Sequence, residues 1–241
     1  MSRTERESSV DCGAVYEQVR GEFAHLAAAL APERLDTVVP AAPDWAVRDV
    51  VAHVVGLAAA LNAQDFPADD DEGGTVWAGR HVAARRERTI DELLTEWAAE
   101  APSFAEGLRL FGYEFGCHFV ADLVVHVHDV QAALELPPLV DPVVLAVALD
   151  HYCDHLSGLL AGAGWGRLTV QSHDGEQWYL GAGAPRVAVA GSAYDLLRTL
   201  AARRSERQVR VLRWSGDVDG LVAFLRECWT GGYSLPVADQ P

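Results

Sequence analysis

The feature that most constrains the fold is a change of sequence pattern near residue 164. Before this point, long stretches carry apolar residues at the three- and four-residue spacing of amphipathic helices. After it, short segments rich in β-branched and aromatic residues alternate with Gly, Asp and Pro, as strands joined by turns do. We therefore expect an α plus α/β protein of two domains, a helical bundle over residues 1–162 and a small α/β domain over residues 163–241.

The helical part is expected to hold five long helices, at residues 10–31, 45–64, 89–111, 119–134 and 142–162. Asp44 is placed to cap the second helix, and Pro137 with Pro138 ends the fourth. Residues 65–80 combine an acidic run with Pro and Gly, which predicts an exposed loop.

The second part is expected to be a small sheet with helices. Strands are predicted at residues 166–172, 175–183, 185–191 and 208–214, and helices at 192–204 and 217–228. The sequence "HDG" between the first two strands is typical of a hairpin turn.

Charge and composition exclude some functions. The chain has 241 residues and a formal charge of −16, and such an acidic surface does not favour binding to nucleic acid. Its polar N-terminus lacks the apolar core of a signal peptide, and we expect no bilayer-spanning segment, hence no membrane partner and a cytoplasmic location. Its four cysteines are widely spaced, which predicts free thiols: Cys12, Cys117, Cys153 and Cys228. Monomer and homodimer remain equally open.

The segment "FVADLVVHVHDVQAAL" at 119–134 places ionisable groups in an otherwise apolar helix. Buried carboxylates and imidazoles are costly unless they are paired, hydrogen-bonded or bound to a metal. Asp122 and His126 share a helix face and Asp129 continues the same line, whereas His128 points elsewhere, either to line the site or to meet solvent. If helices 45–64 and 119–134 are neighbours, His53 can join Asp122 and His126.

Two imidazoles and one carboxylate suit Zn²⁺, with Fe²⁺, Ni²⁺ and Mn²⁺ as alternatives. Three protein ligands leave coordination positions open, which is the pattern of catalytic metal sites. The competing interpretation is a hydrogen-bonded polar pair within a core. A second cluster, "DHYCDHL" at 150–156, contains His151 and His155 at helical spacing, and we interpret it as a solvated helix face.

The pattern resembles the mycothiol-dependent maleylpyruvate isomerase family, which is part of the DinB-like metal-binding superfamily. The stretch "VPAAPDWAVRDVVAHVVG" is similar to the family's second helix, with Pro43, Trp45, Arg48, Asp49 and His53 at the characteristic positions. Asp122, His126 and Asp129 match a second motif, in which the family usually has Glu in place of Asp122. "WYLGAGAPRVAVAGSAYDLLRTLAARR" followed by "WSGD" resembles the family's sterol-carrier-like domain.

The resemblance implies a DinB-like up-and-down four-helix bundle with a divalent metal, most commonly zinc, held by His53, Asp122 and His126. It also implies mycothiol as the thiol cosubstrate of an isomerase or S-transferase that acts on a small electrophile. Asp49 and Asp129 are then expected to orient the two imidazoles. Arg203 and Arg204 are candidate catalytic groups that anchor an anionic substrate, or else a helix-terminal pair.

A second class of function remains open on the sequence. A metal-stabilised bundle that binds a small ligand or a partner, without catalysis, needs the same buried groups. Loss of His53 would then lower stability without removing a turnover. Substrate identity and the role of the acidic loop at 65–74 are open as well.

Overall fold

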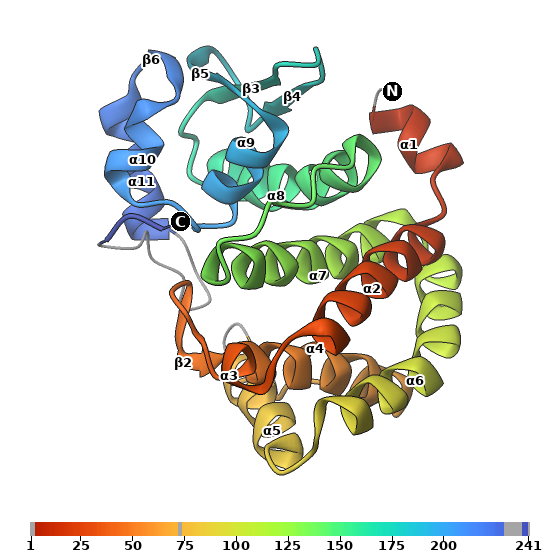
Figure 1. Ribbon diagram of the computed structural model, residues 1–241. Coiled ribbons are helices and arrows are strands. Elements are labelled where there is room, and N and C mark those ends of the chain that lie inside the picture. The colour runs from red at the N-terminus through yellow and green to blue at the C-terminus, as the bar shows by residue number, and fades with distance from the viewer. Residues whose placement is uncertain (1–2, 72–73, 229–237, 241) are drawn as a thin grey trace. The chain divides into compact units, whose positions relative to one another are not determined.

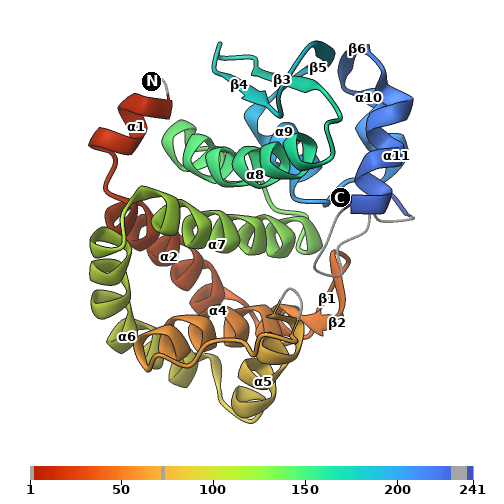
Figure 2. The same cartoon turned by 180° about the vertical axis from the view of Figure 1, so that it is seen from behind.

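The structure is a computed structural model that describes residues 3–71, 74–228 and 238–240 (Figures 1 and 2). These residues form two compact units. Residues 11–139 make up the helical unit, and residues 3–10 join residues 140–228 and 238–240 in the sheet unit. Each unit is described by itself.

Four long helices form a bundle in the helical unit, namely α2 (Cys12–Ala29), α4 (Val47–Asn62), α6 (Ile90–Leu110) and α7 (Tyr113–Ala133). Helix α2 packs against α6 and α7, and α4 packs against the same two helices. The expected architecture of a helical bundle and a small α/β unit is confirmed.

Helices α2 and α6 begin at side chains that accept hydrogen bonds from their free amide groups. Asp11 accepts a hydrogen bond from the amide of Ala14 at the start of α2 (2.9 Å). Thr89 and Glu92 form a reciprocal capping box at the start of α6. Between these helices, the indole Nε1 of the fully buried Trp97 donates to the hydroxyl of Tyr16 (2.9 Å). The core thus contains aromatic groups whose polar atoms are paired.

Three short elements connect α2 to α4: helix α3 (Pro32–Leu35) and the antiparallel strands β1 (Val38–Val39) and β2 (Ala42–Ala46). The prediction that Asp44 caps the next helix is wrong, because Asp44 lies within β2 and α4 begins at Val47. Asp49 takes the capping role instead, since its Oδ2 accepts from the amide of Ala46 (2.9 Å).

Helix α5 (Thr75–Arg85) occupies part of the segment predicted as a loop. Asp71 accepts from the amides of Val76 (3.0 Å) and Trp77 (2.7 Å), so the acidic run supplies an N-terminal cap for α5. These hydrogen bonds to backbone amides lower the pKa of Asp71. The rest of the predicted loop precedes the helix, and residues 72–73 lie outside the described residues.

The sheet unit contains a four-stranded sheet in the order β4-β3-β5-β6. Strands β3 (Arg167–Ser172) and β4 (Gln177–Leu180) form the predicted hairpin, β5 (Pro185–Gly191) runs parallel to β3, and β6 (Arg213–Gly216) is antiparallel to β5. The described helices are α1 (Arg3–Ser9), α8 (Pro142–Gly162), α9 (Ala193–Leu200), α10 (Glu206–Val211) and α11 (Val218–Cys228). Helix α9 packs on β3, β5 and α8.

The prediction of a strand at residues 208–214 is wrong for the first half of that segment. Residues Glu206–Val211 form α10, because Ser205 and Gln208 make a capping box that starts a helix there. Only Arg213 and Trp214 of the predicted segment lie in β6.

A buried ion pair attaches the N-terminal helix α1 to the rest of the sheet unit. Arg6 donates to both oxygens of Asp150 (2.8 and 2.7 Å) and to Glu176 (2.8 Å). The indole Nε1 of Trp178 also donates to Asp150 (2.6 Å). Arg6 and Asp150 are 1% and 0% exposed, so this network forms inside the unit, where sequence pattern predicted only a polar N-terminus.

Helix α8 falls in the sheet unit because it packs against α9 and β4. The domain boundary expected at residues 162–163 stays a prediction. Among the described residues, α8 is the one helix that is long and apolar enough to cross a membrane, contrary to our expectation of no such segment. More than half of its most apolar stretch is buried within the protein.

Cys12, Cys117 and Cys153 are free thiols as expected, whereas the side chain of Cys228 lies outside the described residues.

Candidate metal centre

Three residues of the helical unit meet at one point between α4 and α7. His53 comes from α4, and Asp122 and His126 come from one face of α7. One ligand atom of each lies within 4.8 Å of the others. The three residues chosen from the sequence are therefore neighbours in space, and their role as metal ligands stays a prediction.

The imidazole of His53 is buried, with 5% of the residue exposed. Its ring centroid lies 4.8 Å from that of His126 and 4.9 Å from that of Trp45. Burial, together with the nearby His126, lowers the pKa of His53 to about 3. Its Nδ1 makes no hydrogen bond to any described residue. A neutral imidazole with a free buried nitrogen fits a metal ligand, because metals bind the neutral form.

The carboxylates on α7 flank His126. Its Nε2 lies 3.6 Å from Oδ1 of Asp122, and its Nδ1 lies 4.0 Å from Oδ2 of Asp129. The side chain of Asp122 is 30% exposed and that of Asp129 is 1% exposed. The candidate ligand Asp122 is therefore partly exposed to solvent, whereas the second carboxylate beside His126, that of Asp129, is buried. Two imidazoles and one carboxylate fit a divalent metal with open positions.

The local sequence explains how α4 and β2 build one wall of the centre. Arg48 pairs with Asp36 (2.9 Å), and Asp49 caps the helix at Ala46, so the first turn of α4 is held from both sides. Trp45, at the end of β2, lies over His53 and has its ring 6.3 Å from that of His126. The Asp49 carboxylate is used in the cap, and its expected role as an acceptor for His53 stays a prediction.

The sequence pattern did not identify Trp77 and His81 on α5, which adjoin the centre. The ring of His81 stacks at 6.4 Å from that of His53, and the ring of Trp77 lies 4.3 Å from that of His81. His81 is 5% exposed, and burial together with the nearby Arg85 lowers its pKa. The signal that could have revealed it is Gly56, a glycine inside an apolar helix, because such a glycine commonly marks a close packing contact.

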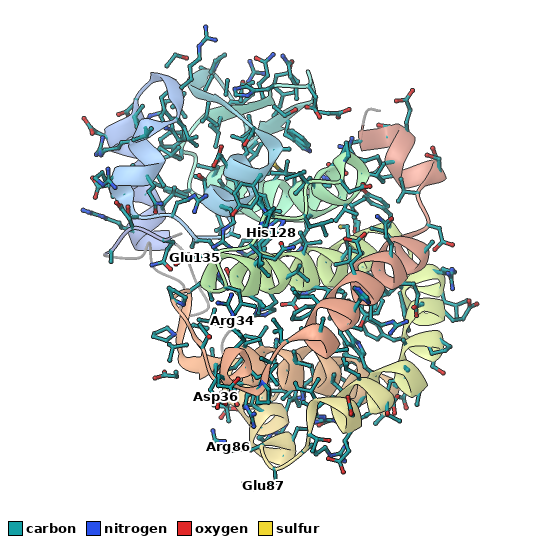
Figure 3. All side chains as sticks on the ribbon, viewed as in Figure 1. Arg34, Asp36, Arg86, Glu87, His128 and Glu135 are labelled. Carbon is teal, nitrogen blue, oxygen red and sulfur yellow. The ribbon has the colours of Figure 1, made fainter. Side chains whose placement is uncertain are left out.

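The other polar groups of α7 and α8 have structural contacts. His128 lies on α7 (Figure 3) and is fully buried, which excludes the second of the two alternatives for this residue, exposure to solvent. Its Nε2 lies 2.8 Å from the carbonyl oxygen of Leu139. In the sheet unit, Asp154 and His155 are exposed as predicted for a solvated face, but Asp150 is buried against Arg6.

Arg203 and Arg204 follow α9 in the sheet unit. Arg203 is buried and donates to the carbonyl of Ala201 (3.1 Å). Arg204 lies 3.5 Å from Asp195 and has its guanidinium 5.5 Å from the ring centre of Tyr194. These three contacts lie within the sheet unit, and the catalytic role of the two arginines stays a prediction.

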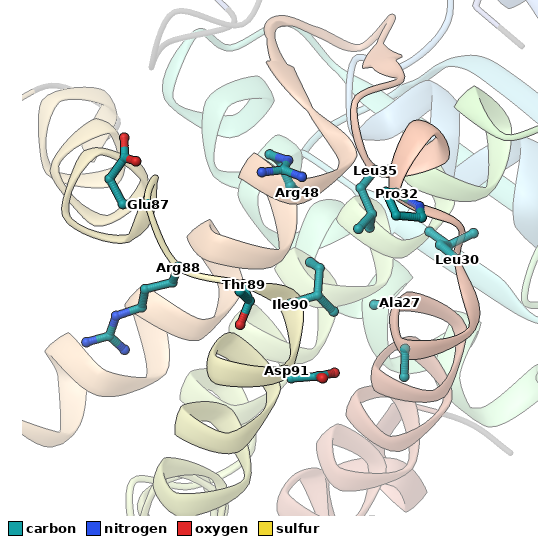
Figure 4. A pocket seen from close by; sticks show the side chains of 11 residues that line it. Ala27, Leu30, Pro32, Leu35, Arg48, Glu87, Arg88, Thr89, Ile90 and Asp91 are labelled. Atoms are coloured by element: carbon teal, nitrogen blue, oxygen red, sulfur yellow. The ribbon is translucent and has the colours of Figure 1, made fainter.

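A surface pocket of about 350 Å³ lies elsewhere in the helical unit (Figure 4). It is lined by the end of α2, by α3, by the start of α4 and by the α5–α6 connection. Its charged groups come from Arg48, Glu87, Arg88 and Asp91. None of the three candidate ligands lines it, so the pocket is separate from the centre.

The fold and the cluster define a helical-bundle protein with a candidate metal centre and an α/β unit. Residues 16–114 match the mycothiol maleylpyruvate isomerase N-terminal domain. The matched segment contains His53 but ends before Asp122 and His126. The family recognised from the sequence is confirmed.

Two solved structures share the fold across most of the chain. One is the crystal structure of the mycothiol-dependent maleylpyruvate isomerase, with a TM-score of 0.54 and 14% identity. The other is a histidine-to-alanine mutant of that enzyme, with a TM-score of 0.52 and 12% identity. Each match covers 85% of this chain and 91% of the other. No curated protein matches this chain in sequence.

Proposed function

We propose that this protein is a metal-dependent enzyme that uses a low-molecular-weight thiol, mycothiol, either to isomerise a small electrophilic substrate or to transfer the thiol to it. The observation that carries the proposal is the cluster of His53, Asp122 and His126, whose ligand atoms lie within 4.8 Å of one another. The family of residues 16–114 supports the choice of thiol.

A divalent metal in this centre, most commonly zinc, would lower the pKa of a thiol so that the nucleophilic thiolate forms near neutral pH. The protein's own groups prepare the site. His53 is held neutral by burial, Trp45 covers its ring from water, and the buried Asp129 is placed to orient His126. The partly exposed Asp122 leaves a solvent-facing side on which a thiol and a substrate could enter.

Two outcomes are open to a thiolate that adds to a conjugated double bond. If the carbon–carbon bond rotates and the thiolate then leaves, the substrate is isomerised and the thiol is regenerated. If the adduct takes up a proton and persists, the thiol is consumed in equal amount with the substrate. Arg203 and Arg204 are proposed to anchor an anionic group of the substrate.

The proposal includes a cytoplasmic enzyme without nucleic-acid or membrane partners. The net charge of −16 supports the first exclusion, and the free thiols of the described cysteines Cys12, Cys117 and Cys153 are typical of a reducing compartment. Sedimentation in an analytical ultracentrifuge distinguishes a monomer from a homodimer.

Metal content tests the proposal directly. Untagged protein is expected to contain about one zinc or other divalent ion per chain by mass spectrometry, and His53→Ala and His126→Ala are expected to lose it. His155→Ala, which removes an exposed imidazole on α8, is the matched control and should retain the metal. An unchanged metal content in both site variants would refute the centre.

Product analysis then separates enzyme from binding protein. Metal-loaded protein is incubated with mycothiol and small cis-configured enedione acids or other electrophiles. Thiol regeneration with an altered substrate indicates an isomerase, and equimolar thiol loss indicates a transferase. Metal binding without any turnover, with His53→Ala lowering only stability, would favour the non-enzymatic ligand-binding alternative.

A further inference from the structure

Helix α5 brings a second set of polar atoms up to the candidate metal centre. Trp77 and His81 are 7% and 5% exposed. Among the described residues, neither ring nitrogen of His81 nor the indole Nε1 of Trp77 has a hydrogen-bond partner. An unmade hydrogen bond of a buried group costs roughly 1–3 kcal/mol. Three such atoms in adjacent rings therefore need an explanation.

The close approach of α5 to α4 is built into the sequence. Gly56 lies one turn after His53, and a Cβ added there would lie 2.4 Å from the Cβ of His81. A glycine within a helix costs about 1 kcal/mol relative to alanine. The missing side chain lets His81 lie against α4, with its ring stacked 6.4 Å from that of His53.

The chemistry of these atoms specifies what they bind. The indole of Trp77 offers only an N–H donor, and imidazole carries at least one N–H in either protonation state. The matching ligand group is an oxygen acceptor. In the described part of the chain, the nearby cations are already paired, since Arg85 donates twice to Glu96 (3.1 and 2.6 Å) and Arg80 lies 3.7 Å from Asp65. A buried site without a spare cation favours an uncharged acceptor over a carboxylate.

We propose that Trp77 and His81 form a binding subsite for an uncharged carbonyl oxygen, such as that of an amide, on the thiol that reacts at the adjacent centre. The proposal rests on the proposed thiol-dependent function and deepens it. The two side chains would recognise a part of the thiol away from its sulfur. The subsite would then distinguish an amide-bearing thiol from a simple alkyl thiol.

Three probe thiols test the subsite. Protein loaded with Co²⁺ is titrated with N-acetylcysteamine, which carries an uncharged amide, with ethanethiol, which lacks it, and with 3-mercaptopropionate, which carries a carboxylate. The sulfur-to-cobalt charge-transfer absorption reports binding. N-acetylcysteamine is expected to bind at least about tenfold more tightly than the other two, which corresponds to one or two hydrogen bonds.

The variants remove the donors one at a time. Trp77→Phe keeps an aromatic ring, His81→Leu removes both nitrogens, and His81→Asn restores a donor. Trp77→Phe and His81→Leu are expected to weaken N-acetylcysteamine about tenfold and to leave ethanethiol unchanged, with partial rescue in His81→Asn. Trp77→Phe keeps the test decisive if His81→Leu does not fold. His155→Ala should bind all three probes as the unaltered protein does.

The outcomes distinguish the two levels of the argument. Charge-transfer absorption with every thiol, but no preference for the amide, would show that the subsite holds water and would overturn the inference alone. Equal weakening of N-acetylcysteamine and ethanethiol in Trp77→Phe would do the same, because the residue would then act on the centre as a whole. No absorption with any thiol would refute the proposed function and the subsite with it.

Discussion

Substitution of Arg6 by Met tests how firmly the N-terminal helix is built into the sheet unit. Arg6 is 1% exposed and makes three hydrogen bonds, two to Asp150 and one to Glu176. In the variant, Asp150 stays fully buried and keeps the hydrogen bond from the indole of Trp178 (2.6 Å). The substitution therefore removes the guanidinium of Arg6 from a fully buried carboxylate.

The expected cost follows from the loss of that ion-pair partner. Removal of one partner of a buried ion pair typically destabilises a protein by about 3–5 kcal/mol. In a protein of this length, each kcal/mol lowers the melting temperature by roughly 2–4 °C. Arg6→Met should therefore lower the melting temperature of the sheet unit by roughly 10 °C. Thermal circular dichroism measures the shift, and hydrogen exchange of the β3 and β4 amides assigns it to this unit.

Arg3→Met on the same helix is the matched control. Arg3 pairs with Glu7 and Asp154, but its side chain is 28% exposed and theirs are 39% and 43% exposed. Solvent-exposed pairs contribute about 0–1 kcal/mol, so this variant should melt within a few degrees of the unaltered protein. A second control combines Arg6→Met with Asp150→Asn, which removes both charges and keeps an oxygen acceptor for Trp178. It should recover part of the lost stability.

A small effect would refute the reasoning. If Arg6→Met costs no more than Arg3→Met, the N-terminal helix does not contribute to the stability of the sheet unit. If the double variant is less stable than Arg6→Met alone, the cost comes from lost packing of the long Arg6 side chain and not from the loss of the ion pair with Asp150.

Two further predictions concern carboxylates. Burial alone would raise the pKa of Glu176, but its hydrogen bond and ion pair with Arg6 lower it below the ordinary value of 4.5. Its contribution to stability is thus present above pH 4.5 and is lost as the pH falls through the lowered pKa; acid titrations of melting temperature should show this loss, and Glu176→Gln should remove it. Asp129→Ala should weaken zinc binding by roughly 10–100-fold in a chelator competition, because this buried carboxylate is placed to orient the imidazole beside it. An affinity equal to that of the unaltered protein would mean that Asp129 serves packing alone.

Elements with strong local signals could be predicted from the sequence. Helix α8 was expected at residues 142–162 and spans Pro142–Gly162, since Asp141 with Pro142 marks its start and the apolar pattern continues to its end. The β3–β4 hairpin was also recognised from its turn. In contrast, residues 206–211 contain β-branched residues that favour a strand, but the cap at Ser205 determines a helix.

We could predict that His53, Asp122 and His126 are neighbours in space. Ionisable groups are rare in apolar helices, and those buried in the same core tend to cluster together. The buried pairing of Arg6 with Asp150 could not be predicted. These residues are 144 positions apart, and an arginine in a polar N-terminus resembles any solvated residue. Such contacts depend on tertiary packing, and the local sequence pattern therefore does not reveal them.

His81 shows where a local signal exists but cannot be interpreted without the fold. Gly56 is unusual within an apolar helix, yet the sequence alone does not say which group fills the space beside it. In the structure that group is His81, so the two features explain each other. The glycine is costly, and so is an imidazole without a hydrogen-bond partner among the residues that the structure describes, but both are understandable if α5 must approach His53 closely. A helix that needed only to cover apolar surface would be better served by alanine at position 56 and an aliphatic residue at position 81.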